Sequence, residues 1–191
     1  MKYDIKELVW EEHKNAERQE FVKTLMSGSI DPKLYATYLY NQLQCYAELE
    51  KWGMHNGLFR QTPGLQRAEN IYKDYSRLWT KEEKPVITDS TKEYIKHINT
   101  ITDDPEKLYA HIYVRHLGDL SGGQMIAKKV PAKKYYDFGA NAKEWKRIVK
   151  EIINEYVNTY QINVVAEAIY CFESATKLFG EMNDLAKTYQ V

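Results

Sequence analysis

With 191 residues, the chain is long enough for one domain with its own hydrophobic core. It has 27 Lys and Arg against 27 Asp and Glu, and this neutral total argues against a dedicated nucleic-acid binder, although a local basic face remains compatible with it. No segment reaches the roughly 18 apolar residues of a membrane span, and the N-terminus lacks the apolar core of a signal peptide. We therefore expect a soluble, cytoplasmic protein with a single domain over residues 1–191.

Apolar residues recur at spacings of three and four along the chain, which predicts helices and no strands. A first helix carries Ile5, Val9 and Ala16 on one stripe. Asp31 before Pro32 is typical of a helix start, because Asp caps free N–H groups and Pro lacks the one that would need a partner. The fold class is all-α, a compact bundle of about eight helices. In chain order we expect helices near residues 5–16, 21–26, 32–53, 65–79, 90–101, 105–130, 142–158 and 161–187.

Three glycines, Gly118, Gly122 and Gly123, lie inside the helical segment 105–130. Together they cost about 2–3 kcal/mol relative to alanine, so they need a compensating reason. Gly118 and Gly122 are four residues apart and share a face without side chains. Their spacing alone slightly favours close contact with another helix over a ligand lying on the backbone. A phosphate loop is a weaker alternative, because no strand precedes the glycines and no Gly-Lys-Ser/Thr follows them.

Of the five histidines, His13 is notable because it lies on the apolar stripe of the first helix. A partly buried imidazole needs a hydrogen-bond partner or a metal, whereas most helical histidines are ordinary polar side chains. Glu17 lies one turn further along, where it could accept the Nδ1 proton and orient Nε2 toward a metal. His116 is the rival ligand, but it lies two residues before Gly118 and should point away from the glycine face.

The segment Tyr113–Gln124 reads Tyr-Val-Arg-His-Leu-Gly-Asp-Leu-Ser-Gly-Gly-Gln and closely resembles the signature of the heme oxygenases. The segment Glu12–Glu17 resembles the proximal helix of that family, in which a His followed by Ala-Glu supplies the axial iron ligand. The resemblance continues in order to Phe172 and Phe179, and it is to soluble bacterial, cyanobacterial and plastid-like members. His116 stands where the family commonly has Tyr, so we assign it no role.

The resemblance implies an enzyme that opens heme with O2 and a reductant and releases biliverdin IXα, CO and iron. Heme would be both substrate and cofactor, with its iron ligated by His13. Gly118 and Gly122 would make room for oxygen, and Asp119 would organise the water that delivers protons. The implied catalytic residues are Asp119, Gly118, Gly122 and Arg115. The implied heme-binding residues are His13, Glu17, Lys6, Tyr113, Ser121, Lys146, Lys150 and Phe172.

Cations suit the pocket mouth because heme carries two propionates. The family commonly places propionate contacts at the positions of Lys6, Tyr113, Lys146 and Lys150. It often has Arg at the last of these, and Lys there keeps the charge but loses the bidentate geometry. Spacing alone is equally compatible with a solvated basic face.

Residues 128–150 contain eight Lys or Arg against Asp137 and Glu144, a local excess of six positive charges. This patch could steer an acidic partner. The resemblance to soluble heme oxygenases makes reduced ferredoxin the expected electron donor. A bilin reductase is a further expected partner, acting on the product.

Two alternatives remain. A heme carrier or sensor would bind without degrading, but it has no need of a carboxylate at Asp119. A helical bundle with a di-iron site or a Cys nucleophile is disfavoured, because paired Glu-x-x-His motifs are missing. Cys45 and Cys171 have neither a Cys-x-x-Cys nor a zinc spacing, and we expect both to be buried thiols.

Overall fold

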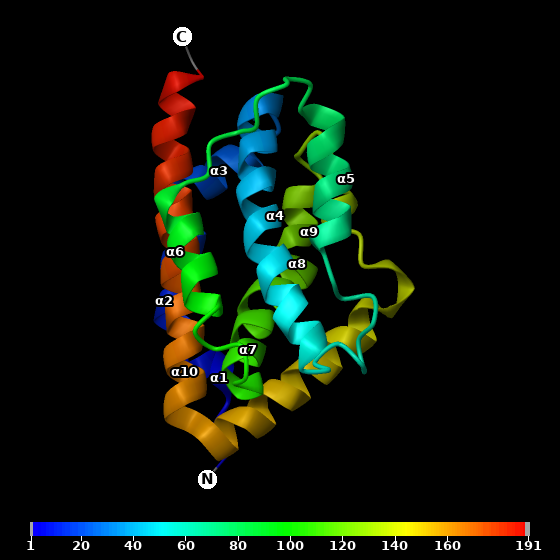
Figure 1. Cartoon of the computed structure of the whole chain (residues 1–191), viewed down its shortest axis with the longest axis vertical. Helices are drawn as coiled ribbons and strands as arrows, with labels where there is room; N and C mark the ends of the chain where they lie inside the picture. The colour runs from blue at the N-terminus through cyan, green and yellow to red at the C-terminus, as the bar shows by residue number, and fades with distance from the viewer. Residues whose placement is uncertain (1, 190–191) are drawn as a thin grey trace.

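The computed structural model describes residues 2–189, and these residues form an all-helical fold without strands, as predicted (Figure 1). A π-helical turn, η1 (Tyr113–Leu117), joins α7 to α8, and two short 3-10 turns, η2 (Lys134–Tyr136) and η3 (Gly139–Asn141), precede the last helix. No helix in this part of the chain is both long and apolar enough to cross a membrane. The α-helices are α1 (Ile5–Leu8), α2 (Trp10–Glu17), α3 (Glu20–Met26), α4 (Pro32–His55), α5 (Ala68–Leu78), α6 (Asp89–Ile98), α7 (Pro105–Ile112), α8 (Gly118–Ser121), α9 (Gly123–Ala127) and α10 (Ala142–Thr188).

The long helices α4 and α10 organise the fold. α4 packs against α5, α6 and α7, whereas α10 packs against α2, α3, α6, α7 and η1. Figure 1 shows α10 running beneath the other helices, bending sharply at the lower end and then following the length of the molecule. The bend lies at Tyr160, whose backbone is non-helical (φ −127°, ψ 40°). This position confirms the expected break between residues 158 and 161.

The bend of α10 also holds the N-terminal segment. Asn158 Oδ1 accepts a hydrogen bond from the Tyr3 backbone N–H at 2.9 Å, and Asn154 Oδ1 accepts one from the Ile5 N–H at 3.0 Å. The Ile5 N–H is one of the groups that the start of α1 leaves without a helical partner, whereas Tyr3 lies just before the Asp4 cap.

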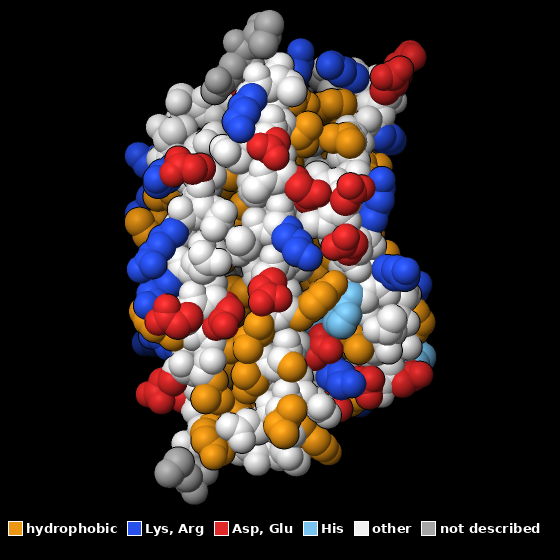
Figure 2. All heavy atoms as spheres, turned by 90° about the vertical axis from the view of Figure 1, so that its left-hand side faces the viewer, with side chains coloured by type: hydrophobic (Ala, Val, Ile, Leu, Met, Phe, Trp, Pro, Cys, Tyr) orange, Lys and Arg blue, Asp and Glu red, His pale blue; other side chains and the backbone are white. Residues whose placement is uncertain are grey.

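Figure 2 views the face that carries α6 and α10. Charges of both signs cover most of this surface, and hydrophobic side chains gather toward its lower end, where α10 bends.

Several predicted boundaries were wrong because they depend on the local backbone. The expected first helix is split at the buried Val9, whose backbone leaves the helical region (φ −120°, ψ 20°). Thr88, not Asp89 or Ser90, caps α6. α6 ends at Ile98 rather than near residue 101. The start at Pro32 is confirmed, with the Asp31 carboxylate accepting from two backbone N–H groups.

α5 begins at Ala68, three residues later than predicted. The Arg67 guanidinium donates to the backbone oxygens of Gly64, Leu65 and Gln66, so the preceding loop is held in a non-helical form. The buried core extends across the bundle, and it includes Cys45 and Cys171 as expected.

Candidate functional site

Two runs of the chain lie alongside each other and carry most of the predicted site residues. At one end, the Asp4 carboxylate lies near enough to Tyr113 to raise the pKa of its hydroxyl, second to burial as a cause. At the other end, α3 contacts α9, and a Cβ on Gly28 would lie 3.8 Å from Lys129 Cδ. The run α1–α3 therefore follows the run η1–α9 in the same direction. This arrangement sets α2, with His13, opposite α8, with Gly118.

The predicted helix over residues 105–130 contains the π-helical turn η1, which the sequence analysis missed. Its five residues, Tyr113–Leu117, immediately precede Gly118. A π-turn widens the helix by one residue per turn and is found frequently at functional sites. The sequence signal that could have indicated it is the dense group of large and polar side chains directly before the first glycine.

The three glycines have different surroundings, and this separates the two explanations that the spacing left open. A Cβ on Gly118 would meet nothing within 4 Å, and one on Gly122 would meet only the Gly118 carbonyl oxygen at 3.5 Å. A Cβ on Gly123 would lie 2.5 Å from Cδ1 of Tyr136. Tight packing therefore explains Gly123 alone. Gly118 and Gly122 are exposed and leave the backbone open.

Asp119 turns its carboxyl group toward α4, where the Tyr46 hydroxyl donates a hydrogen bond to Oδ2. Burial raises the pKa of this carboxyl to about 7, and hydrogen bonding to Tyr46 and Tyr135, followed by the charges of Arg115 and Arg67, only partly opposes the shift. A carboxyl with such a pKa exchanges its proton near neutral pH. The predicted proton-handling residue therefore has the electrostatics that this role needs.

Arg115 is 6% exposed, and no carboxylate contacts its guanidinium within residues 2–189. Its Nη1 donates to Gln42 Oε1 at 3.1 Å, and the guanidinium carbon lies 4.1 Å from the centre of the Tyr94 ring. Gln42 also donates to the hydroxyls of Tyr38 and Tyr135. Arg115 thus belongs to a buried polar network behind the glycine face, and the structure places it away from that open surface.

His13 is partly buried, as expected, with 38% of its side chain exposed. Its ring centre lies 5.7 Å from that of the buried Phe172 on α10, in an edge-on arrangement. The expected contact to Glu17 exists, but the nitrogen 3.1 Å from Glu17 Oε1 is Nε2 and not Nδ1. The correction has a simple reason, because the nitrogen at the tip of the ring reaches a side chain four residues along the helix.

The predicted cationic contacts lie on separate elements. Lys6 is exposed, with its Nζ 5.7 Å from the centre of the Trp10 ring, and the break at Val9 separates it from the helix of His13. Lys146 is half-buried and Lys150 exposed near the start of α10. No carboxylate of residues 2–189 forms an ion pair with any of these three lysines. Tyr113 is half-buried and Ser121 exposed, whereas Arg147 is engaged with Glu144 and Glu151.

Glu50 is a central residue that the sequence analysis missed. Its carboxylate accepts hydrogen bonds from the backbone N–H groups of Arg67 and Ala68, and so caps α5 from α4. His116 Nε2 lies 2.9 Å from the same carboxylate, and burial lowers the pKa of this fully buried imidazole. His116 therefore points away from the glycine face, as expected, and donates to Glu50. Its ring also packs edge-on against Tyr46, the hydrogen-bond partner of Asp119.

Comparison with known sequences finds one family over nearly the whole chain. The family model of heme oxygenase matches residues 2–181. The heme oxygenase of the red alga Porphyra purpurea is 30% identical over 94% of this chain and 85% of its own length. Heme oxygenase 2 of the cyanobacterium Synechocystis is 27% identical, over 92% of this chain and 80% of its own.

Solved structures show the same architecture. The heme oxygenase of Leptospira interrogans superposes with a TM-score of 0.82 at 26% identity, covering 93% of this chain and 97% of its own. Heme oxygenase-1 of Synechocystis, solved in complex with heme, gives a TM-score of 0.80 over 97% and 93% of the two chains. Its 22% identity supports the fold alone.

Proposed function

The chain belongs to the heme oxygenase family, and we propose that it binds heme between α2 and the run η1–α9 and cleaves the ring oxidatively to biliverdin, CO and iron. The observation that carries this proposal is the open backbone at Gly118, directly beside a carboxyl whose pKa is about 7. A heme carrier would need the open surface but not the proton-exchanging group.

The residues of this chain fit a bound heme on both of its faces. On one side, His13 offers a half-exposed imidazole held against Phe172. On the other side, Gly118 and Gly122 let a flat ligand and a small molecule such as O2 approach the backbone. Lys6, Lys146 and Lys150 are free of ion pairs within residues 2–189 and supply cations for the propionates. To ligate iron through Nε2, the His13 ring must exchange its contact with Glu17 for the metal.

Heme, when bound, supplies the redox chemistry, and the protein supplies geometry and protons. We assign proton delivery to Asp119, because its carboxyl gives and regains a proton near neutral pH. The Tyr46 hydroxyl orients this carboxyl by donating to it. Arg115 donates a hydrogen bond to Gln42, and its guanidinium lies over the ring of Tyr46 and so helps to hold this tyrosine in place.

Reduced ferredoxin is the electron donor that we propose, on the basis of the local excess of positive charge over residues 128–150. Turnover driven by ferredoxin should slow as salt is added, because exposed charges are screened beyond about 10 Å at 0.1 M. The small-molecule reductant ascorbate provides the control. A ferredoxin-driven rate that does not change between 20 and 300 mM salt (about a fourfold shorter screening length) would remove ferredoxin steering from the proposal.

The main experiment is a heme titration followed by product analysis. The chain is loaded with ferric heme without oxygen, then given reductant and air, and the products are separated by chromatography. We expect loss of the Soret band and appearance of biliverdin. A persistent Soret band without biliverdin would instead identify a carrier or sensor.

Two variants test the assigned roles. His13→Ala should lose turnover and leave a heme whose spectrum is restored by added imidazole. His55→Ala, which changes an exposed histidine at the end of α4, should behave as the parent. An unchanged spectrum for His13→Ala would refute the ligand assignment. Asp119→Ala should retain heme affinity but yield other oxidation products, and a normal biliverdin yield from it would contradict the proton role.

A further inference from the structure

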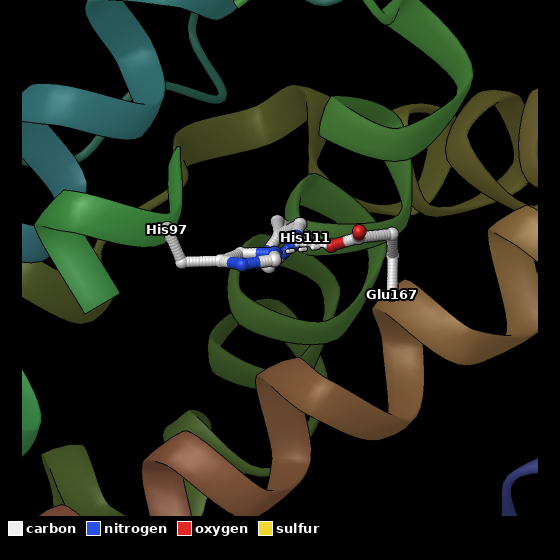
Figure 3. Close-up of side chains that lie close together, drawn as sticks. All are labelled: His97, His111 and Glu167. Carbon is white, nitrogen blue, oxygen red and sulfur yellow. Dashed lines mark hydrogen bonds and ion pairs between the residues drawn. The ribbon is translucent and has the colours of Figure 1, made fainter. Parts of the chain in front are cut away.

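Three side chains from three helices meet away from the proposed heme site. His97 comes from α6, His111 from α7 and Glu167 from α10 (Figure 3). The Nε2 atoms of both histidines lie 2.7 Å from the same carboxylate oxygen, Glu167 Oε2. One ligand atom from each of the three residues falls within 4.8 Å of the other two. Figure 3 shows His97 and Glu167 reaching toward each other, with His111 between them.

Neighbouring side chains hold both rings in place. The fully buried His111 has Nδ1 2.9 Å from the Tyr94 hydroxyl. The His97 ring stacks on Tyr170 with the ring centres 3.8 Å apart. A metal-ligating histidine almost always has a polar partner at its other nitrogen, which orients the ring. His111 already has such a partner, so its orientation requires no rearrangement of the fold.

We propose that His97, His111 and Glu167 form a binding site for a divalent first-row transition metal ion. Two imidazole nitrogens and one carboxylate oxygen suit Zn²⁺, Fe²⁺ or Co²⁺, whereas Mg²⁺ and Ca²⁺ prefer oxygen ligands alone. The His97 side chain is 24% exposed and that of Glu167 12%, so an ion can enter from solvent and keep water as a further ligand. The site shares no residue with His13 or with the glycine run.

The ion would replace two hydrogen bonds. Without it, the Nε2–H group of each imidazole donates to Glu167. With it, each Nε2 lone pair faces the metal, and the proton moves to Nδ1 of the same ring. In His111 that proton is accepted by the Tyr94 hydroxyl, and in His97 by solvent. The ligands must also separate slightly, because 2.7 Å is a hydrogen-bond distance and ligands about 2.0–2.1 Å from a tetrahedral zinc ion lie further apart.

The affinity should be limited by charge. The ligands carry one negative charge when both imidazoles are neutral, and the nearby Arg115 cation opposes a dication, because its guanidinium lies over the ring of Tyr94. The site should therefore bind reversibly and release the ion to a chelator.

The test is a titration of the heme-free full-length chain with CoCl2, read by the visible absorption of the ligated ion. Two other His–Glu pairs exist in the described residues. His116–Glu50 is buried, whereas His13–Glu17 is accessible to solvent, so the parent for this experiment is His13→Ala. This choice also makes the outcome independent of the proposed heme chemistry. We expect an absorption band that saturates at one equivalent, and ZnCl2 should remove it and raise the Tm.

His97→Gln in the same background should weaken Co²⁺ binding at least tenfold and abolish the Zn²⁺-dependent rise in Tm. His97 is partly exposed, so this variant should fold, and circular dichroism verifies that it does. His55→Gln is the matched control and should bind as the parent does. Equal Co²⁺ affinity in His97→Gln, or a parent that shows no saturable band, would overturn the proposal and leave the cluster as an ion pair only.

Discussion

The carboxyl group of Asp119 links the chemistry of the site to the stability of the fold. Burial raises its pKa from the ordinary 3.8 to about 7. One pKa unit corresponds to about 1.4 kcal/mol, so this carboxylate costs the folded chain about 4 kcal/mol at high pH. Because the folded-state pKa is raised, the folded chain bears none of this cost below pH 3.8, where the carboxyl is protonated in both states. Stability is then lost as the pH rises from 3.8 through 7, and the full cost is reached above 7.

Asp119→Asn removes this titration while keeping the shape of the side chain and an acceptor for Tyr46. We expect the free energy of unfolding of the variant, relative to the parent, to increase by about 2–3 kcal/mol between pH 5 and pH 8. Over this interval the folded parent releases a proton that the unfolded chain has already lost. Urea denaturation of the heme-free chain, followed by circular dichroism at several pH values, measures the difference directly.

The control is Ser121→Ala, an exposed position on the same helix that adds and removes no titratable group. Its stability relative to the parent should not depend on pH. If the difference between Asp119→Asn and the parent is equally constant from pH 5 to pH 8, the carboxyl is not destabilised by burial. Its assignment as the proton-exchanging group near neutral pH would then lose its physical basis.

Three further substitutions test the local packing. Gly118→Ala should stabilise the heme-free chain by up to about 1 kcal/mol, because the methyl group meets nothing, yet weaken heme binding in a spectroscopic titration; unaltered heme affinity would contradict an open ligand face. Gly123→Ala should destabilise the chain by about 1–3 kcal/mol in urea, because its methyl group would collide with Tyr136, and an unchanged midpoint would show that this contact is not tight. Glu50→Gln should cost about 1–3 kcal/mol, because the buried His116 loses its anionic acceptor, and a smaller effect would mean that the amide replaces the carboxylate there.

Features that depend on neighbouring residues were predictable from the sequence. The Asp31–Pro32 start of α4 follows from the chemistry of free N–H groups, and the structure has the Asp31 cap that this chemistry requires. The break of α10 at Tyr160 was located within the interval left between two predicted helices. The partial burial of His13 followed from its place on the apolar stripe of the first helix.

Features that join distant parts of the chain were not predictable. Glu50 caps a helix whose first residue is Ala68, and it also binds His116, so its role depends on three elements meeting. His111 and Glu167 are 56 residues apart in sequence and meet only because α7 packs against α10. No local pattern in the sequence marks such a pair, since periodicity reports which face of a helix is buried but not its neighbour.

The glycine cluster shows how energetics and packing together separate explanations that spacing cannot. Three interior glycines cost about 2–3 kcal/mol, and helix packing alone could have explained all of them. The structure assigns that explanation only to Gly123, which lies against Tyr136. At Gly118 an alanine would fit the heme-free fold without any contact, so the folded chain by itself has no packing reason to retain glycine. The heme that we propose between this surface and His13 supplies a reason that the folded chain by itself does not.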